Sequence, residues 1–213
     1  MQRESGRMEI FSSSIQCFLS DIFHKDLELI KYGDLLTIQS LTINGKTLDG
    51  KRQIVNFNDI KLFKNIRYLE ICNVVISNYM VDILSSLSYL ESIVFRNCTF
   101  RKSIITLNNL NSVKRLRIES CKNFKLELID NIDIDNLTIA GCLLGDFSLI
   151  RNSKISVLDI SRTTIDNINS IMKLNLKKLV VSHDLYNKYN DILNRSTICV
   201  IVMAKDGYYI ENV

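Results

Sequence analysis

The 213-residue sequence has no proline, no tryptophan, seven glycines and only two histidines. Its six cysteines include no CxxC pair, so the tight ligand cluster of a zinc site is missing and no metal is predicted. The one glycine cluster, AGCLLGD, lacks both the Walker lysine and the GxGxxG spacing of nucleotide-binding loops. The sequence therefore predicts no cofactor.

Long hydrophobic runs are also missing from the chain. No window approaches the roughly 18 uninterrupted apolar residues of a membrane span. Near the N-terminus, serine, glutamine and aspartate interrupt every apolar run before the core of a signal peptide could form. These absences predict no membrane association and an intracellular, cytoplasmic location, where cysteines stay reduced.

The composition is that of a globular protein. Apolar residues make up 46% of the chain and charged residues 23%, which predicts a single folded domain over residues 1–213. The net charge of +4 falls short of the strongly basic balance expected of a dedicated nucleic-acid binder. It permits acidic partners without requiring them.

A nine-residue pattern recurs along the chain. In LESIVFRNC the apolar residues Leu90, Ile93 and Phe95 are followed by Cys98 at the ninth position. The same frame begins at residues 38, 66, 90, 113, 134, 155, 176 and 197, and the last four steps are each 21 residues. An equal spacing of this kind indicates a repeat protein.

This pattern, L-x-x-L-x-L-x-x-C, resembles that of the leucine-rich repeat family, of the intracellular type with repeats of 21 to 24 residues. The resemblance covers residues 36–205. It implies an α/β fold, a right-handed horseshoe solenoid of about eight repeats with a parallel β-sheet on the concave face and short helices or 3₁₀ turns on the convex face. Because a repeat array must cover its apolar ends, residues 1–35 are predicted to form an N-terminal helical cap and residues 206–213 a C-terminal cap or tail.

The convex side is predicted from the residues between the nine-residue frames. Apolar spacings of three and four residues predict α-helices at residues 76–87 and 100–107. A spacing of three in the fifth and sixth copies, over residues 144–150 and 165–174, predicts 3₁₀ turns.

Three cysteines, Cys98, Cys121 and Cys142, share the ninth position of the frame. In the family this position holds Asn or Cys, whose side chain packs inward and satisfies loop backbone groups, so the resemblance implies buried structural thiols. Neighbours stacked about 4.8 Å apart could also reach a disulfide, but burial in a reducing compartment favours free thiols. Thr163 and Asp184 continue the column with hydrogen-bonding groups.

No catalytic residues are predicted. The tripeptide SHD at residues 182–184 contains the residue types of a hydrolase triad, but neighbours on a strand point to opposite faces and cannot converge. His183 is therefore expected at the surface. We predict that the protein is not an enzyme and has no small-molecule substrate.

The concave face carries the candidate binding site. Its predicted partner-binding residues are Arg67, Tyr68, Glu70, Arg96, Lys114, Arg115, Arg117, Asp159, Lys177 and Lys178. Five of them form a basic centre on three consecutive repeats, with Tyr68 as an aromatic anchor. Charges are also what any solvated sheet face displays, so this alternative stays open. A second candidate patch is apolar and consists of Val180, Ile198, Ile201 and Met203.

These features predict a non-catalytic interaction module or adaptor that binds a protein partner, acidic on part of its surface, through the concave face. The protein partner is an expectation that comes from the family resemblance. The alternative is a factor associated with RNA or the ribosome, in which the same arginines and lysines contact phosphates.

Overall fold

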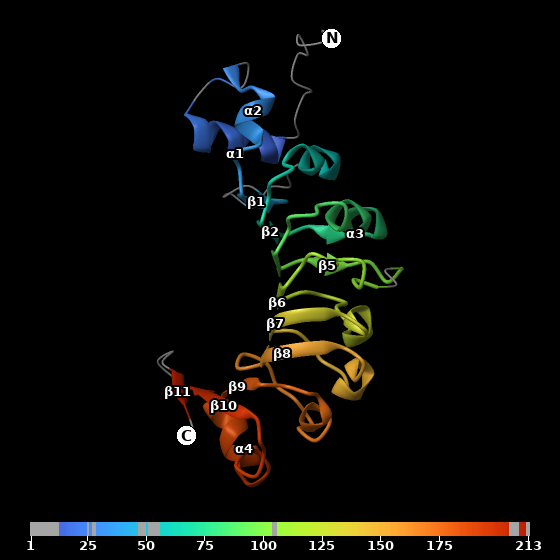
Figure 1. Cartoon of the computed structure of the whole chain (residues 1–213), viewed down its shortest axis with the longest axis vertical. Coiled ribbons are helices and arrows are strands. Elements are labelled where there is room, and N and C mark those ends of the chain that lie inside the picture. Colours follow the sequence, from blue (N-terminus) through green and yellow to red (C-terminus); the bar gives the residue numbers. More distant parts are fainter. Residues whose placement is uncertain are drawn as a thin grey trace.

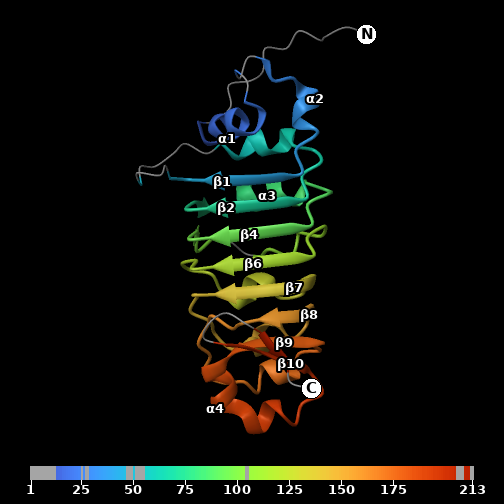
Figure 2. The same ribbon diagram turned by 90° about the vertical axis from the view of Figure 1, so that its left-hand side faces the viewer.

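The chain forms a solenoid whose strands stack into one long sheet, with helices and turns on the other side (Figure 1). The computed structural model of the chain describes residues 13–24, 26, 29–46, 50, 56–103, 106–204 and 209–211. Figure 2 shows the sheet face-on, with the parallel strands pointing to the same edge. This is the predicted leucine-rich-repeat solenoid.

The main sheet contains eight parallel strands and a final antiparallel strand, β11 (Tyr209–Glu211). The parallel strands are, in spatial order, β1 (Ser40–Asn44), β2 (Tyr68–Cys72), β4 (Ser92–Arg96), β6 (Arg115–Glu119), β7 (Asp133–Ala140), β8 (Lys154–Asp159), β9 (Lys178–Ser182) and β10 (Cys199–Met203). Spatial order follows chain order, so each repeat adds one strand beside the previous one.

The register of the sheet confirms the repeat frame. The fourth position of all eight copies lies in one row across the sheet: Leu41, Leu69, Ile93, Leu116, Leu137, Leu158, Leu179 and Val200. Each of these side chains is buried. Because side chains alternate between the two faces of a strand, the residues on either side of this row belong to the concave face.

The connections between the described strands combine α-helices with shorter 3₁₀ segments. Helix α3 (Asn78–Ser85) confirms the helix predicted at residues 76–87. The segment predicted as a helix at residues 100–107 differs from the prediction, because described residues 101–103 and 106–112 form turns and bends after β5 (Thr99–Phe100). Apolar spacing alone cannot tell a short helix from a turn that buries the same residues, since both direct them inward. The 3₁₀ segments are η2 (Phe57–Leu62), η3 (Leu126–Ile129), η4 (Phe147–Ile150) and η5 (Ile171–Lys173), of which η4 and η5 were predicted.

A sharp turn follows four of the strands, at the eighth position of the frame. Asn73, Asn97, Ser120 and Gly141 all have positive φ angles, between 50° and 61°. Asparagine and glycine tolerate this left-handed conformation better than other residues. The turn directs the ninth residue inward, and the chain then continues into the convex side, where β3 (Val75–Ile76) pairs with β5.

Four of the ninth residues, Cys98, Cys121, Cys142 and Thr163, are buried, and three of them donate to a backbone carbonyl of the preceding repeat. The Cys98 thiol donates to the Ile71 carbonyl at 3.2 Å, and the Thr163 hydroxyl donates to the Ile139 carbonyl at 2.9 Å. Cys121 makes the equivalent contact with Phe95, at 3.4 Å. Both Cys121 and Cys142 are buried free thiols, which confirms the predicted structural role of this column.

Asp184 does not continue the column. It is exposed in the first turn of α4 (His183–Leu193), because the chain enters this helix directly after β9. The Ser182 hydroxyl caps the helix by accepting a hydrogen bond from the Leu185 N–H at 3.2 Å. A helix N-terminus replaces the usual loop, so the ninth residue is not directed inward.

The two ends of the stack are covered differently. Helix α1 (Ser13–Phe23) packs against β1 and buries Ile15 and Leu19, whereas Ile22 of the same helix is 46% exposed. The short α2 (Tyr32–Leu35) buries Leu35. At the other end β11 pairs with β10. Of the segment 206–213, predicted to be a C-terminal cap or tail, the structure describes only residues 209–211.

Candidate functional site

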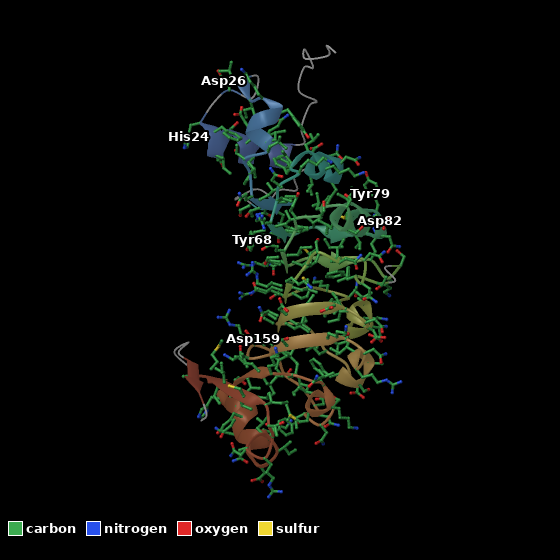
Figure 3. All side chains as sticks on the ribbon, viewed as in Figure 1. His24, Asp26, Tyr68, Tyr79, Asp82 and Asp159 are labelled. Carbon is green, nitrogen blue, oxygen red and sulfur yellow. The ribbon has the colours of Figure 1, made fainter. Side chains whose placement is uncertain are left out.

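The concave face carries three rows of side chains, set by the strand register. The middle row runs Thr42, Glu70, Val94, Arg117, Thr138, Asp159, Val180 and Ile201. Figure 3 shows Tyr68 and Asp159 on this side of the sheet and Tyr79 and Asp82 on the opposite side. The predicted site residues on the strands therefore share one face.

The basic centre is held together by ion pairs across the strands. Arg96 on β4 lies between two carboxylates, with Nη2 3.3 Å from Glu70 on β2 and Nε 2.9 Å from Glu119 on β6. Glu119 also pairs with Arg117 on its own strand. The Glu119 side chain is 13% exposed and the two arginines are 46% and 44% exposed. The guanidinium groups therefore face outward over a mostly covered carboxylate.

A second set of contacts involves residues at the start of the strands or just before it. Arg67 pairs with Glu91, and Arg115 lies 4.0 Å from the other oxygen of Glu91. Lys114 is exposed and forms no ion pair with any residue that the structure describes. Together these contacts form what we call the arginine ladder: Arg67, Glu70, Glu91, Arg96, Lys114, Arg115, Arg117 and Glu119.

The ladder has five positive and three negative side chains, so its net charge is +2. Ser92 and Val94 of β4 are buried although alternation places them on this face. In register, Ser92 lies between Tyr68 and Arg115, and Val94 lies between Glu70 and Arg117. The long side chains of the ladder thus form a layer over the sheet instead of extending freely into solvent.

Tyr68 and Cys72 complete the β2 part of the site. The Tyr68 hydroxyl lies 3.5 Å from Glu70, and the Cys72 thiol lies 3.6 Å from the other oxygen of that carboxylate. Burial, followed by the negative charge of Glu70, raises the pKa of Tyr68 and raises the pKa of Cys72 to about 12. Both groups therefore remain protonated at neutral pH and act as hydrogen-bond donors.

Three predicted site residues lie apart from the ladder. Asp159 on β8 and Lys178 on β9 are two and three strands away from β6, or about 10 and 14 Å at the usual strand spacing. Asp159 is committed to a local turn, because its Oδ1 accepts hydrogen bonds from the Ser161 N–H at 3.0 Å and hydroxyl at 2.6 Å. Lys177 is exposed beside Lys178. The structure thus divides the predicted site into a compact ladder and an outlying group.

The prediction of an exposed apolar patch near the C-terminus is wrong, because its side chains are buried or partly buried. Val180 and Ile201 are 6% and 7% exposed, and Ile198 packs partly against the core. Strand β11 continues the sheet next to β10 and lies on the concave side in Figure 1. Sequence alternation gave the correct face for Val180 and Ile201 but could not show that both side chains are buried.

The remaining candidate chemical groups have structural roles. His183 is exposed on α4, with Nδ1 3.1 Å from the Asn187 side chain, and Ser182 is the helix cap. The hydrogen bond with Cys98 and burial raise the pKa of Cys121, and burial raises the pKa of Cys142. A raised pKa disfavours the nucleophilic thiolate.

Two ladder residues, Glu91 and Glu119, were missing from the predicted site. Both stand at outward positions of the same nine-residue frame that identified the arginines. The predicted site centred on the cluster of cations and omitted these two carboxylates, although it included Glu70 and Asp159. Reading every outward position across neighbouring strands would have found them, because opposite charges there lie within reach of each other.

Two kinds of feature are absent from the described parts of the chain. No group of three or more His, Cys, Asp and Glu side chains there is placed to hold a metal ion. No helix there is long and apolar enough to cross a membrane.

Comparisons with known proteins give structural likeness alone. No protein-family model matches the sequence. No curated protein sequence matches it. The structure is similar to an internalin (inlF) of Listeria monocytogenes strain 4b F2365, with a TM-score of 0.48, 16% identity, and coverage of 81% of this chain and 57% of that chain. It is also similar to L. monocytogenes InlP, with a TM-score of 0.43, 12% identity, and coverage of 79% and 63%. The chain thus spans less than two thirds of either protein.

Proposed function

We propose that this chain is a non-catalytic protein-interaction module, an adaptor that binds a partner through the arginine ladder of its concave face. The observation that carries the proposal is the cross-strand pairing of Arg96 with both Glu70 and Glu119. Ion pairs hold the guanidinium groups in place before any partner binds. Less side-chain conformational entropy is therefore lost on binding.

The composition of the ladder supports a protein partner with an acidic surface. Its net charge of +2 attracts acidic groups, and Lys114 has no carboxylate of its own among the described residues. Tyr68 adds an aromatic ring of the kind enriched at interface hot spots. The outlying Lys177 and Lys178 extend the positive surface along the sheet.

The same composition argues against phosphate recognition. Glu70, Glu91 and Glu119 lie among the arginines, and a phosphate chain would be repelled by each of them. A protein surface can place acidic groups against the arginines and basic groups against the glutamates of the ladder. The test below therefore distinguishes a protein partner from the alternative, an RNA or ribosomal partner. The proposed setting is intracellular and cytoplasmic, which the free thiols of Cys72, Cys98, Cys121, Cys142 and Cys199 support.

The proposal is tested by affinity capture with charge-reversal variants. The site variant carries Arg96→Glu, Lys114→Glu and Arg117→Glu. Its control carries Lys64→Glu, Arg151→Glu and Lys154→Glu, which are exposed residues outside the ladder and produce the same net charge. We expect the site variant to bind the partner about tenfold more weakly or worse, which corresponds to a loss of about 1.4 kcal/mol in binding free energy.

Nuclease treatment and salt distinguish the two partner classes. Capture that survives nuclease and falls only modestly with salt supports a protein partner, since few ion pairs are formed. Loss on nuclease treatment, with a steep decline as salt increases, indicates contacts to nucleic-acid phosphates and overturns the proposal. Equal capture by the site variant and its control overturns the role of the ladder.

A further inference from the structure

A groove lies on a different part of the molecule, along the edge where the first strands end. Its volume is about 680 Å³, and it is formed by the loops after β1, β2, β4 and β6 together with the start of α3. Figure 2 shows the edge to which these strands point. The groove therefore adjoins the concave face without being part of the arginine ladder.

The groove is positively charged and its charges are unpaired. Lys46, Arg101 and Lys122 line it, and none of its described lining residues is acidic. All three cations are exposed, and none forms an ion pair with a described residue. This contrasts with the ladder, in which all but one of the cations already lie near a carboxylate.

The walls of the groove are built by close packing of the turns. A Cβ atom added to Gly45 would lie 2.5 Å from the Asn73 carbonyl oxygen, so only glycine allows the first loop to approach the second this closely. Asn73 and Asn97 hold left-handed turns in the wall, and the Asn73 amide donates to the Asn44 side chain at 2.8 Å. The groove is thus a consequence of the repeat turns.

The spacing of the cations suits an extended chain. Lys46, Arg101 and Lys122 belong to the first, third and fourth repeats, which span three strand steps or about 14 Å. An extended peptide rises about 3.3 Å per residue, so a segment of four or five residues covers this length and can place acidic side chains along it. Asparagine amides in the wall both donate and accept hydrogen bonds, as a peptide backbone requires, whereas a phosphate chain can only accept. The exposed Tyr79 adds an apolar contact.

We propose that this groove binds an extended acidic segment of a protein partner, at a site separate from the arginine ladder. The negative side chains of the segment would pair with Lys46, Arg101 and Lys122. The inference does not depend on the proposed function of the concave face, because the two surfaces share no residue.

The test measures binding of a fluorescein-labelled hexaglutamate peptide to the full chain by fluorescence anisotropy at low salt. The groove variant carries Lys46→Gln, Arg101→Gln and Lys122→Gln, and the control carries Lys64→Gln, Arg151→Gln and Lys154→Gln. We expect the groove variant to bind about tenfold more weakly, since exposed ion pairs each contribute modestly, and the control to stay within about twofold. The ladder variant Arg96→Gln, Lys114→Gln, Arg117→Gln should also stay within about threefold.

Several results would overturn the inference. Equal weakening in the groove variant and the control would show attraction by net charge alone, and a larger loss in the ladder variant would assign the peptide to the concave face. Tighter binding of an oligothymidylate with six phosphates would indicate a nucleic-acid site. Perturbation of the Asn73 and Asn97 side-chain amide signals by hexaglutamate in ¹⁵N NMR spectra of the unaltered protein supports the groove even if a variant folds poorly. Unchanged signals contradict it.

Discussion

Replacing Glu119 by glutamine tests whether the arginine ladder is a coupled structure. The substitution keeps the shape of the side chain and removes its charge. In the native chain one oxygen of Glu119 pairs with Arg117, and the other lies 2.9 Å from Arg96 Nε. After the change Arg96 retains only Glu70, at 3.3 Å, and Arg117 retains no carboxylate within ion-pair distance among the described residues.

The expected loss of stability follows from the exposure of the groups. Exposed ion pairs typically contribute about 0.2–1 kcal/mol. Solvent screens these pairs from the arginine side, but Glu119 itself is only 13% exposed, so each pair should lie near the upper end of that range. Two pairs then give a decrease of about 1–2 kcal/mol in the free energy of unfolding. For a chain of this length the melting temperature should fall by about 2–8 °C.

The measurement is urea denaturation followed by circular dichroism, with Glu127→Gln as the matched control. Glu127 is exposed on η3 and forms no ion pair with a described residue, so its variant should change stability by less than about 0.5 kcal/mol. A double-mutant cycle with Arg96→Gln should give a coupling energy of about 0.5–1 kcal/mol. Equal stabilities of the two glutamine variants, or additive effects in the cycle, would refute the coupled ladder.

Three further predictions concern the core, the thiols and the turns. In urea denaturation Phe100→Ala should lower the free energy of unfolding by about 3–5 kcal/mol, because the ring is fully buried and its centroid lies 5.4 Å from that of Phe95. The control Tyr89→Ala should change the free energy of unfolding by less than about 0.5 kcal/mol, because the Tyr89 side chain is 55% exposed. At pH 8, peptide mapping should show that iodoacetamide labels the exposed Cys199 much faster than Cys72. The labelling rate of Cys72 should rise about tenfold per pH unit from pH 8 to 10, because only the thiolate reacts and the pKa of Cys72 is about 12. A plateau of that rate near pH 9 would contradict the raised pKa. Because φ of Asn97 is 52°, Asn97→Gly should keep the native stability, whereas Asn97→Val should lower the free energy of unfolding by about 1–2 kcal/mol. Thermal unfolding measures both variants, and equal melting temperatures would show that the left-handed turn imposes no strain.

The repeat frame could be predicted because it depends on local pattern alone. An apolar residue at the fourth position of each copy must face the core, and stacking the copies places these residues in one row from Leu41 to Val200. The same logic placed Cys98 and Thr163 in the buried column. It failed at Asp184, because the chain enters a capped helix at that point.

The charged site was predicted only in part. Position in the frame identifies which residues reach the concave face, so Arg96 and Arg117 were found from the sequence. Whether a cation is free or paired depends on its neighbours on adjacent strands, which are more than 20 residues away in the chain. Glu119 therefore became part of the site only when strands β4 and β6 were placed side by side.

The sequence by itself determined the solenoid, its register and the face that each strand residue occupies, since a periodic pattern of buried side chains has one way to stack. Tertiary structure alone decided three things: that Arg96 is paired with carboxylates of both neighbouring strands, that Val180 and Ile201 are covered, and that Lys46, Arg101 and Lys122 line one groove. These properties arise from contacts between repeats. A pattern within one repeat carries no information about them, because burial fixes the direction of a side chain but not its partner.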